Sequence, residues 1–371
     1  MEFCNLKIYQ PDGTFRTGGL SLSGDRIGAA QASADACDMG GLYAIPGLID
    51  IHFHGCAGYD LCDGTHKAIS TMARYQAESG VCAICPATMT LPEERLAAIM
   101  EAAASYQTDR RDAALVGINL EGPFLAESRK GAQNGDYLQK PDAALFRRLQ
   151  EKAQGLIKLC DLAPELPGAL DVIGELAGEV RLSLAHTDAD YDTACEAFRR
   201  GAREVTHLFN AMAPMTHREP GLIGAALDND EVGVELITDG FHVHPAAVRA
   251  AFQLFENRII LISDSMAATG LGDGVYTLGG QQVTVKGGRA SLGGGSTLAG
   301  STANLFDCMR RAVGMGVPLG QAVRSASTNP ARAIGIQHDY GSLEPGKLAN
   351  IILLDEDLNI NTLILRGQII D

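Results

Sequence analysis

Apolar runs of strand length alternate along the chain with longer segments whose apolar residues recur at helical spacing. Amphipathic stretches at residues 67–79, 92–106, 143–151, 166–176, 191–200 and 245–255 predict helices. The strand-length runs lie at residues 43–51, 83–89, 115–120, 156–162, 181–185, 204–207, 233–237 and 259–262. Strands that alternate with helices form parallel sheets, and eight of them suffice to close a barrel. The pattern therefore predicts the α/β class, with a TIM-like (β/α)8 barrel.

The two ends of the chain follow a different pattern. Residues 6–37 and 347–370 contain short alternating segments, punctuated by glycines near the N-terminus, and predict small antiparallel strands. We expect them to pair into one small β-sandwich domain formed by residues 1–45 and 341–371. The barrel then comprises residues 46–340. Glycine pairs at turn positions within residues 276–292 predict a β-hairpin inserted into the barrel unit near residues 275–292.

Composition narrows the class of protein. The chain has 371 residues, 46% of them hydrophobic, which is enough to bury a barrel-sized core. Its formal net charge of −15 argues against nucleic acid or an anionic membrane as the main partner. No apolar run is long enough for a membrane span. The chain opens without a secretory signal, and its nine cysteines are scattered, so we expect a reducing cytoplasm.

Two pairs of cysteines lie close together in the sequence. Cys82 and Cys85 have CxxC spacing, but they stand in an apolar run and no second pair follows at zinc-finger spacing. We interpret them as core cysteines. Cys56 and Cys62 follow the first predicted barrel strand closely enough to suggest metal binding or redox sensing, and we interpret them as unliganded loop thiols.

Residues able to bind metal follow five of the predicted strands. His52 and His54 come directly after the first run, and side chains two apart on a strand share a face. The C-terminal ends of barrel strands form the catalytic face. The other candidates lie at the same ends: Glu121, His186, His207 and Asp264. Each alone could be a core histidine or a cap, but jointly those explanations need several coincidences of position, so the pattern favours a metal site.

The motifs around these residues resemble those of a known family. Residues 46–54, PGLIDIHFH, are similar to the first-strand signature of the amidohydrolase superfamily. Residues 120–124, LEGPF, resemble the mark of its N-acetylglucosamine-6-phosphate deacetylase branch. The resemblance covers nearly the whole chain, through KGAQ at 130–133, AHT at 185–187, THLFNAM at 206–212, HREPG at 217–221, TDGFH at 238–242, SDSM at 263–266 and LAGS at 298–301.

The resemblance implies a metal-dependent hydrolase that removes acetate from an N-acetylated amino-sugar 6-phosphate. By resemblance, Glu121, His186 and His207 hold the principal divalent metal. Members that keep the HxH pair bind a second metal, which implies a further site of His52, His54, bridging Glu121 and Asp264. Zinc or iron suits these ligands, with one or two ions per subunit. Asp264 would act as general base and then as general acid.

The resemblance also implies how a phosphosugar would be held. Arg218 would bind the phosphate, because a guanidinium offers paired donors. Many members carry histidine where this chain has Gln133, which leaves the reaction type unchanged but leaves the preferred sugar epimer open. In several members the residue at His242 reaches across a dimer interface, so we expect a homodimer. The other implied substrate contacts are Ala132, Asn210, Ala211, Leu298, Ala299 and Gly300.

Other functions remain open at this point. A dihydroorotase-like hydrolase of cyclic amides shares the HxH start, but it usually needs a carboxylated lysine, and none lies between residues 115 and 124. N-acetylgalactosamine 6-phosphate differs from the gluco substrate by one hydroxyl orientation. A catalytically silent barrel would be expected to lack a candidate ligand or Asp264, whereas all six candidates are present in this sequence. His242 and His244 could form another metal pair.

Overall fold

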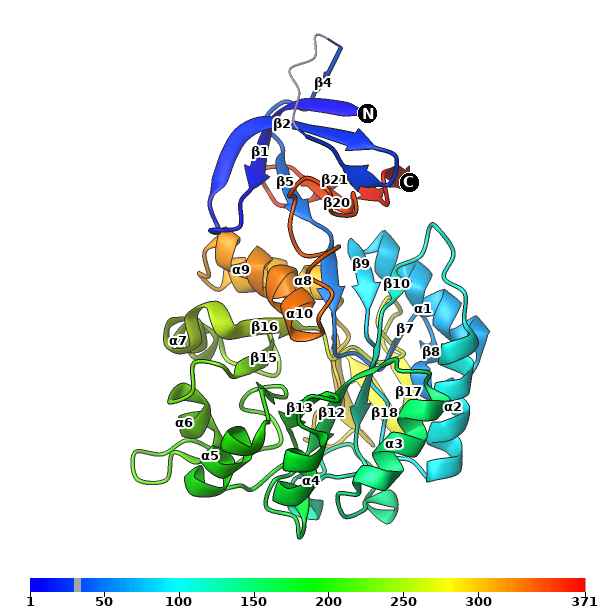
Figure 1. Ribbon diagram of the computed structural model, residues 1–371, viewed down its shortest axis with the longest axis vertical. Coiled ribbons are helices and arrows are strands. Elements are labelled where there is room, and N and C mark those ends of the chain that lie inside the picture. The colour runs from blue at the N-terminus through cyan, green and yellow to red at the C-terminus, as the bar shows by residue number, and fades with distance from the viewer. Residues whose placement is uncertain (30–34, 371) are drawn as a thin grey trace.

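The computed structural model describes residues 1–29 and 35–370, so residues 30–34 and 371, which fall in the predicted terminal domain, lie outside this description. Its larger part is a barrel, coloured from light blue to orange in Figure 1, with helices around the strands. The barrel strands, in chain order, are β6 (Leu48–Asp50), β9 (Val81–Ile84), β11 (Ile118–Glu121), β12 (Ile157–Leu162), β13 (Arg181–Leu184), β14 (Glu204–Val205), β15 (Gly233–Ile237) and β16 (Ile259–Ile262).

Hydrogen bonds between neighbouring strands close the ring. The strands β11 to β16 pair in parallel in chain order, and β9 pairs with β6. A parallel bridge between Ala87 and Asn119 joins these two groups. The amide of Asp264 donates to the carbonyl of His52 at 2.9 Å, which joins the last strand to the first. The predicted (β/α)8 barrel is confirmed.

The outer helices begin where the sequence supplies caps. The side chains of Thr65, Asp142 and Asp190 accept backbone N–H groups in the first turns of α1, α3 and α5. The helices are α1 (His66–Glu78), α2 (Glu93–Ser105), α3 (Ala143–Lys152), α4 (Ala169–Leu176), α5 (Tyr191–Arg200), α6 (Gly221–Leu227), α7 (Pro245–Phe255), α8 (Leu305–Gly314), α9 (Leu319–Ala326) and α10 (Thr328–Ala333). No helix in the described ranges has both the length and the apolar character needed to cross a bilayer.

Several predicted boundaries were wrong. The run 43–51 is two strands, because at Gly47 the chain passes from the terminal sheet, where β5 (Tyr43–Pro46) lies, into the barrel. The run 115–120 is likewise divided, with β10 (Ala114–Leu115) paired to β9 and β11 paired to β12. The runs 83–89 and 204–207 end early, at Ile84 and Val205. Helices α6, α8, α9 and α10 were not predicted; the last three follow residue 262, where the strand and helix alternation ends.

The two ends of the chain meet in one mixed sheet, shown in blue and red at the top of Figure 1, where both termini lie. Its order is β22-β21-β20-β5-β1-β2-β3, with β4 also paired to β1. The sequence predicted antiparallel pairing throughout, which is wrong for two strands, because β4 and β5 run parallel to β1. Its remaining strands are β1 (Glu2–Tyr9), β2 (Phe15–Ser23), β3 (Arg26–Ile27), β4 (Cys37–Asp38), β20 (Ile351–Leu354), β21 (Ile360–Leu365) and β22 (Gln368–Ile370).

Smaller elements surround the C-terminal ends of the barrel strands. The predicted hairpin insertion is a three-stranded antiparallel sheet of β17 (Gly274–Leu278), β18 (Gln281–Lys286) and β19 (Arg289–Leu292). The strands β7 (Gly55–Cys56) and β8 (Tyr59–Asp60) form a short ribbon just after the HxH pair. Among the described residues, the 3-10 helices η1 (Leu61–Asp63), η2 (Glu127–Arg129) and η3 (Gly135–Tyr137) follow β8 or β11, whereas η4 (Glu256–Arg258) directly precedes β16.

Candidate metal centre and active site

The structure brings all six predicted metal-binding residues together at one end of the barrel. His52 and His54 follow β6, Glu121 is the last residue of β11, and the other three follow β13, β14 and β16. Those three have positive φ angles, 46° at His186, 31° at His207 and 47° at Asp264. This region is costly for residues other than glycine, and such strain collects at functional sites.

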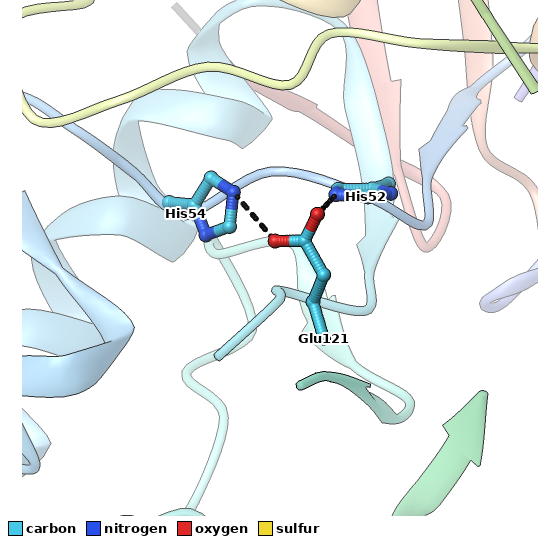
Figure 2. Close-up of side chains that lie close together, drawn as sticks. All are labelled: His52, His54 and Glu121. Carbon is cyan, nitrogen blue, oxygen red and sulfur yellow. Dashed lines mark ion pairs between the residues drawn. The ribbon is translucent and has the colours of Figure 1, made fainter. Parts of the chain in front are cut away.

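Glu121 lies at the centre of the cluster. Figure 2 shows its carboxylate between two imidazoles, with one oxygen turned toward each. Oε1 lies 3.5 Å from Nε2 of His52, and Oε2 lies 3.2 Å from Nε2 of His54. Oδ1 of Asp264 lies 3.3 Å from the same nitrogen of His54. The same Glu121 carboxylate belongs to a second group with His186 and His207, and within each group the ligand atoms lie within 4.8 Å of one another.

The hydrogen bonds of His186 and His207 indicate that both imidazoles are oriented to bind a metal ion. Nδ1 of His186 lies 2.8 Å from the carbonyl oxygen of Arg129, and Nδ1 of His207 lies 3.1 Å from that of Asn210. A carbonyl can only accept, so each Nδ1 carries a proton and Nε2 is the ring nitrogen left to bind a metal ion. The two Nε2 atoms lie 3.1 Å apart, and both face Oε1 of Glu121, at 3.1 and 3.4 Å. Three electron-pair donors that face one point fit a bound cation.

Electrostatics supports the same interpretation. Burial would raise the pKa of Glu121, but the imidazoles of His52 and His54 hold it well below its ordinary range. Burial alone would lower the pKa of His54, yet the carboxylates of Glu121 and Asp264 raise it to about 10. Burial lowers the pKa of His207. The shared carboxylate is therefore ionised and needs positive charge beside it, either protons on imidazoles or a metal ion.

A cavity of about 420 Å³ opens directly onto this cluster. Seven of the predicted substrate contacts line it: Ala132, Gln133, Asn210, Ala211, His242, Leu298 and Gly300. Two do not. Ala299 is buried beside the wall, at 1% exposure. Arg218 is exposed outside the cavity, where its Nη1 lies 2.6 Å from Nε2 of its neighbour His217.

His242 is hydrogen bonded to a neighbouring carboxylate and is not part of either group around Glu121. Its Nδ1 lies 2.8 Å from Oδ2 of Asp239, and the other oxygen of Asp239 accepts the backbone N–H of His242. His244 instead accepts the N–H of Ala246 as the N-cap of α7. Within the described residues, neither histidine belongs to a group of three or more side chains that could hold a metal ion.

The sequence did not reveal three further residues at or behind the site. Arg129 lines the cavity and pairs with Asp188 at 2.5 Å. Glu235, on β15, lies 2.8 Å from Nδ1 of His52. Asp50, on β6, accepts the hydroxyl of Ser263 at 2.5 Å and so ties the first strand to the last. The signal available for Glu235 and Asp50 was a single charged residue in an otherwise apolar run.

The cysteines contribute no ligand to these groups. Cys82, Cys85, Cys56 and Cys62 are all buried and free. No metal-ligand group found among the described residues contains any of them. The sulfur of Cys62 accepts the backbone N–H of Met89, so this thiol is packed into the wall behind the site.

Comparison with known proteins agrees with this geometry. The sequence profile of the Amidohydrolase family matches residues 43–370. The chain belongs to the amidohydrolase family. Amidohydrolases are metal-dependent hydrolases, and the two residue groups around Glu121 are able to hold metal.

Several relatives that align with most of this amidohydrolase are deacetylases of N-acetylated amino-sugar 6-phosphates. It is 38% identical to the N-acetylglucosamine-6-phosphate deacetylase of Vibrio furnissii, over 92% of this chain and 86% of that protein. It is 37% identical to the N-acetylgalactosamine-6-phosphate deacetylase of Escherichia coli O157:H7, over 87% of this chain and 86% of that one. The solved N-acetyl-D-glucosamine-6-phosphate deacetylase of Mycobacterium smegmatis superposes with a TM-score of 0.93 at 33% identity, with both chains fully covered.

Proposed function

We propose that this amidohydrolase cleaves the acetamide of N-acetyl-D-glucosamine 6-phosphate, giving D-glucosamine 6-phosphate and acetate. The observation that carries the proposal is the Glu121 carboxylate, shared by two histidine pairs at the wall of a cavity. Full-length similarity to deacetylases of this substrate supports it. A related Mycobacterium smegmatis structure contains N-acetyl-D-glucosamine 6-phosphate.

The metal would be held by the residues around Glu121. We propose a principal site of Glu121, His186 and His207, and a second site of His52, His54, Glu121 and Asp264. Imidazole and carboxylate ligands suit zinc or iron. When bound, such a cation polarises the amide carbonyl and lowers the pKa of water to near 7.

Asp264 is the proposed general base and acid. It is ionised, because the hydrogen bond from His54 and the positive charge of the imidazoles lower its pKa despite burial, which acts in the other direction. Its side chain lines the cavity, within reach of a water that attacks the acetamide carbonyl. The carboxylate takes the proton of that water and then donates it to the nitrogen of the leaving amino sugar.

Substrate binding is proposed for the residues that line the cavity. His242, oriented by Asp239, and the loop at Asn210 and Ala211 would hold the phosphate end. Ala132, Gln133 and the segment 298–300 would surround the sugar and acetyl group. Arg218 is exposed and outside the cavity of its own chain, so we propose a homodimer in which the phosphate site is completed at the interface. Two exposed phenylalanines support such an interface: Phe209, which lines the cavity, and Phe241, the neighbour in sequence of the lining residue His242.

We further propose the division into a terminal β-domain, residues 1–45 and 341–371, and a barrel domain, residues 46–340, with the insertion near 275–292. The pairing of β20 with β5 supports this boundary. A reducing cytoplasm is the proposed compartment, supported by the free state of all nine cysteines.

N-acetylgalactosamine 6-phosphate is the second candidate substrate. The 37% identity to a deacetylase of that sugar in Escherichia coli O157:H7 favours keeping it in the test. Gln133 lies in the cavity wall at a position where many relatives carry histidine, so the preference between the gluco and galacto epimers has to be measured.

The test is acetate release by metal-replete protein from both phosphosugars and from unphosphorylated N-acetylglucosamine. We expect rapid release from a phosphosugar and a loss of about 10²-fold or more in Asp264→Asn, because the proton-transfer group is removed. Asp192→Asn, an exposed acid on α5, is the matched control and should keep full activity. No acetate from any of the three substrates, with metal bound, would refute the proposal and make cyclic amides the next substrates to test.

A further inference from the structure

Glu235 is a buried carboxylate that takes no part in the cavity. It lies on β15 with 0% exposure, in the run Gly-Val-Glu-Leu-Ile whose other members are apolar or glycine. A buried carboxylate is costly unless it is paired and hydrogen bonded. What Glu235 pairs with therefore indicates why it is present.

Its first contact is with the HxH pair. Oε2 of Glu235 lies 2.8 Å from Nδ1 of His52. The carboxylate is an acceptor, so Nδ1 of His52 carries a proton, and Nε2, which lies 3.5 Å from Oε1 of Glu121, is the ring nitrogen left to bind a metal ion. Nε2 of His52 is buried and has no hydrogen-bond partner among the described residues.

Its second contact is with the other histidine pair. The same Oε2 accepts the backbone N–H of His207 at 3.2 Å. The carbonyl of Glu235 accepts the N–H of Leu208 at 2.8 Å. His207 has a φ of 31°, so its backbone needs external support to stay in this conformation. Glu235 thus supports one residue from each of the two groups that share Glu121.

The other three imidazoles lack such a partner. Nδ1 of His186 and of His207 donates to neutral backbone carbonyls. Nδ1 of His54 has no hydrogen-bond partner within the described ranges. An acidic partner on the far nitrogen orients a histidine ligand and makes its other nitrogen a stronger electron donor than a neutral carbonyl does.

We propose that Glu235 is a positioning residue for the metal centre, one that sets the affinity of the HxH half-site through His52. This inference rests on the proposed two-metal function and goes beyond it by assigning a different support to each half-site. The half-site of His186 and His207 keeps its carbonyl acceptors and depends less on Glu235.

The test measures metal stoichiometry and affinity rather than turnover alone. Wild type, Glu235→Gln and Glu235→Ala are loaded with Zn²⁺, passed through gel filtration and assayed for bound metal, and Co²⁺ titrations followed by absorption give the stepwise affinities. We expect two tightly bound equivalents in wild type. In Glu235→Gln one equivalent stays tight and the other weakens by about 10- to 100-fold. Glu235→Ala should weaken it further, because Nδ1 of His52 loses its acceptor.

Glu204→Gln is the matched control. Glu204 is equally buried, on the neighbouring strand β14, but its partner is Arg181 rather than a histidine. It should keep both equivalents, and thermal melts check that each variant is folded.

Unchanged stepwise affinities in Glu235→Gln, equal weakening of both equivalents, or the same loss in Glu204→Gln would overturn the inference. A wild type with one equivalent and normal acetate release would overturn it while the deacetylase function stands, whereas a metal-loaded wild type that releases no acetate would refute the function itself.

Discussion

Gln133 uses both ends of its side-chain amide on the protein itself. Its Nε2 donates to Oε2 of Glu121 at 2.8 Å, and its Oε1 accepts the N–H of Thr90 at 2.7 Å. The N–H of Thr90 can only donate, so the orientation of the amide is fixed. Gln133 is 3% exposed although it lines the cavity. It therefore orients the shared carboxylate as well as facing the space for substrate.

Replacing Gln133 by leucine should weaken both folding and catalysis. Gln133→Leu leaves the buried N–H of Thr90 unpaired, which costs about 1–3 kcal/mol of the free energy of unfolding. It also removes a charge-assisted hydrogen bond from Glu121, so kcat/KM for acetate release should fall. Urea unfolding and the acetate assay measure the two effects.

A second glutamine provides the control for Gln133. Gln150 clamps Ile157 with both amide ends, at 2.9 and 3.0 Å, and is absent from the cavity lining. Gln150→Leu should lower stability and leave kcat/KM unchanged. Equal losses of kcat/KM in the two variants would show that Gln133 acts through general stability only.

The site residues at the strand ends could be predicted from the sequence, but the buried residues that hydrogen bond to them or hold the strands together could not. His52, Glu121 and the other candidates stood where apolar runs stop, and barrel geometry brings such ends together. Glu235 and Asp50 lay inside runs that predict core strands, and only the ring closure places them beside His52 and Ser263. Arg218 was assigned from its motif, and its exposed position outside the cavity could not be inferred from a local pattern.

At the level of elements, Gly47 separates two strands that the sequence presents as one. Its N–H donates to the carbonyl of Asn350, just before β20 of the terminal sheet, and the next amide, of Leu48, donates to the carbonyl of Gly80, just before β9 of the barrel. A Cβ at Gly47 would lie 2.8 Å from both Cβ and Sγ of Cys82. The close approach, rather than an unusual φ, is what requires glycine here. Hydrophobicity alone does not show where a buried run changes sheets, which is why run 43–51 was predicted as one strand.

Gly47→Ala should therefore destabilise the protein by about 1–3 kcal/mol, because a rigid Cβ cannot move away from Cys82 without a backbone shift. The measurement is the midpoint of urea unfolding. Gly174→Ala is the control, since Gly174 lies in α4 with nothing within 4 Å of an added Cβ, and alanine there should be neutral or stabilising by up to about 1 kcal/mol. A Gly47→Ala variant as stable as wild type would contradict the packing argument.

At the level of the whole molecule, contacts between the terminal sheet and the barrel connect the two units. The guanidinium of Arg366 donates to the carbonyl of Asp112 at 2.8 Å, and that of Arg324 to the carbonyl of Pro11 at the same distance. Arg26 pairs with Asp339 at 2.7 Å. The first barrel strand also continues directly from β5 of the sheet. We expect unfolding of the barrel and of the sheet to be coupled, so that a change at the metal centre affects the melting of the whole chain.

Metal removal should accordingly lower the melting temperature by several degrees. Without a cation, the lone pairs of His186 and His207 and the charge of Glu121 face one another at 3.1 to 3.4 Å. A ligand that binds only the folded state stabilises it by about 2.7 kcal/mol when its free concentration is 100-fold above Kd. Differential scanning fluorimetry before and after chelation, and after Zn²⁺ is restored, measures the shift.

In His186→Asn the response to Zn²⁺ should be largely lost, because the principal site lacks a ligand. A wild-type melting temperature unaffected by chelation, under conditions that remove bound metal, would show that the cluster is stable without a cation and that the lone-pair argument is wrong.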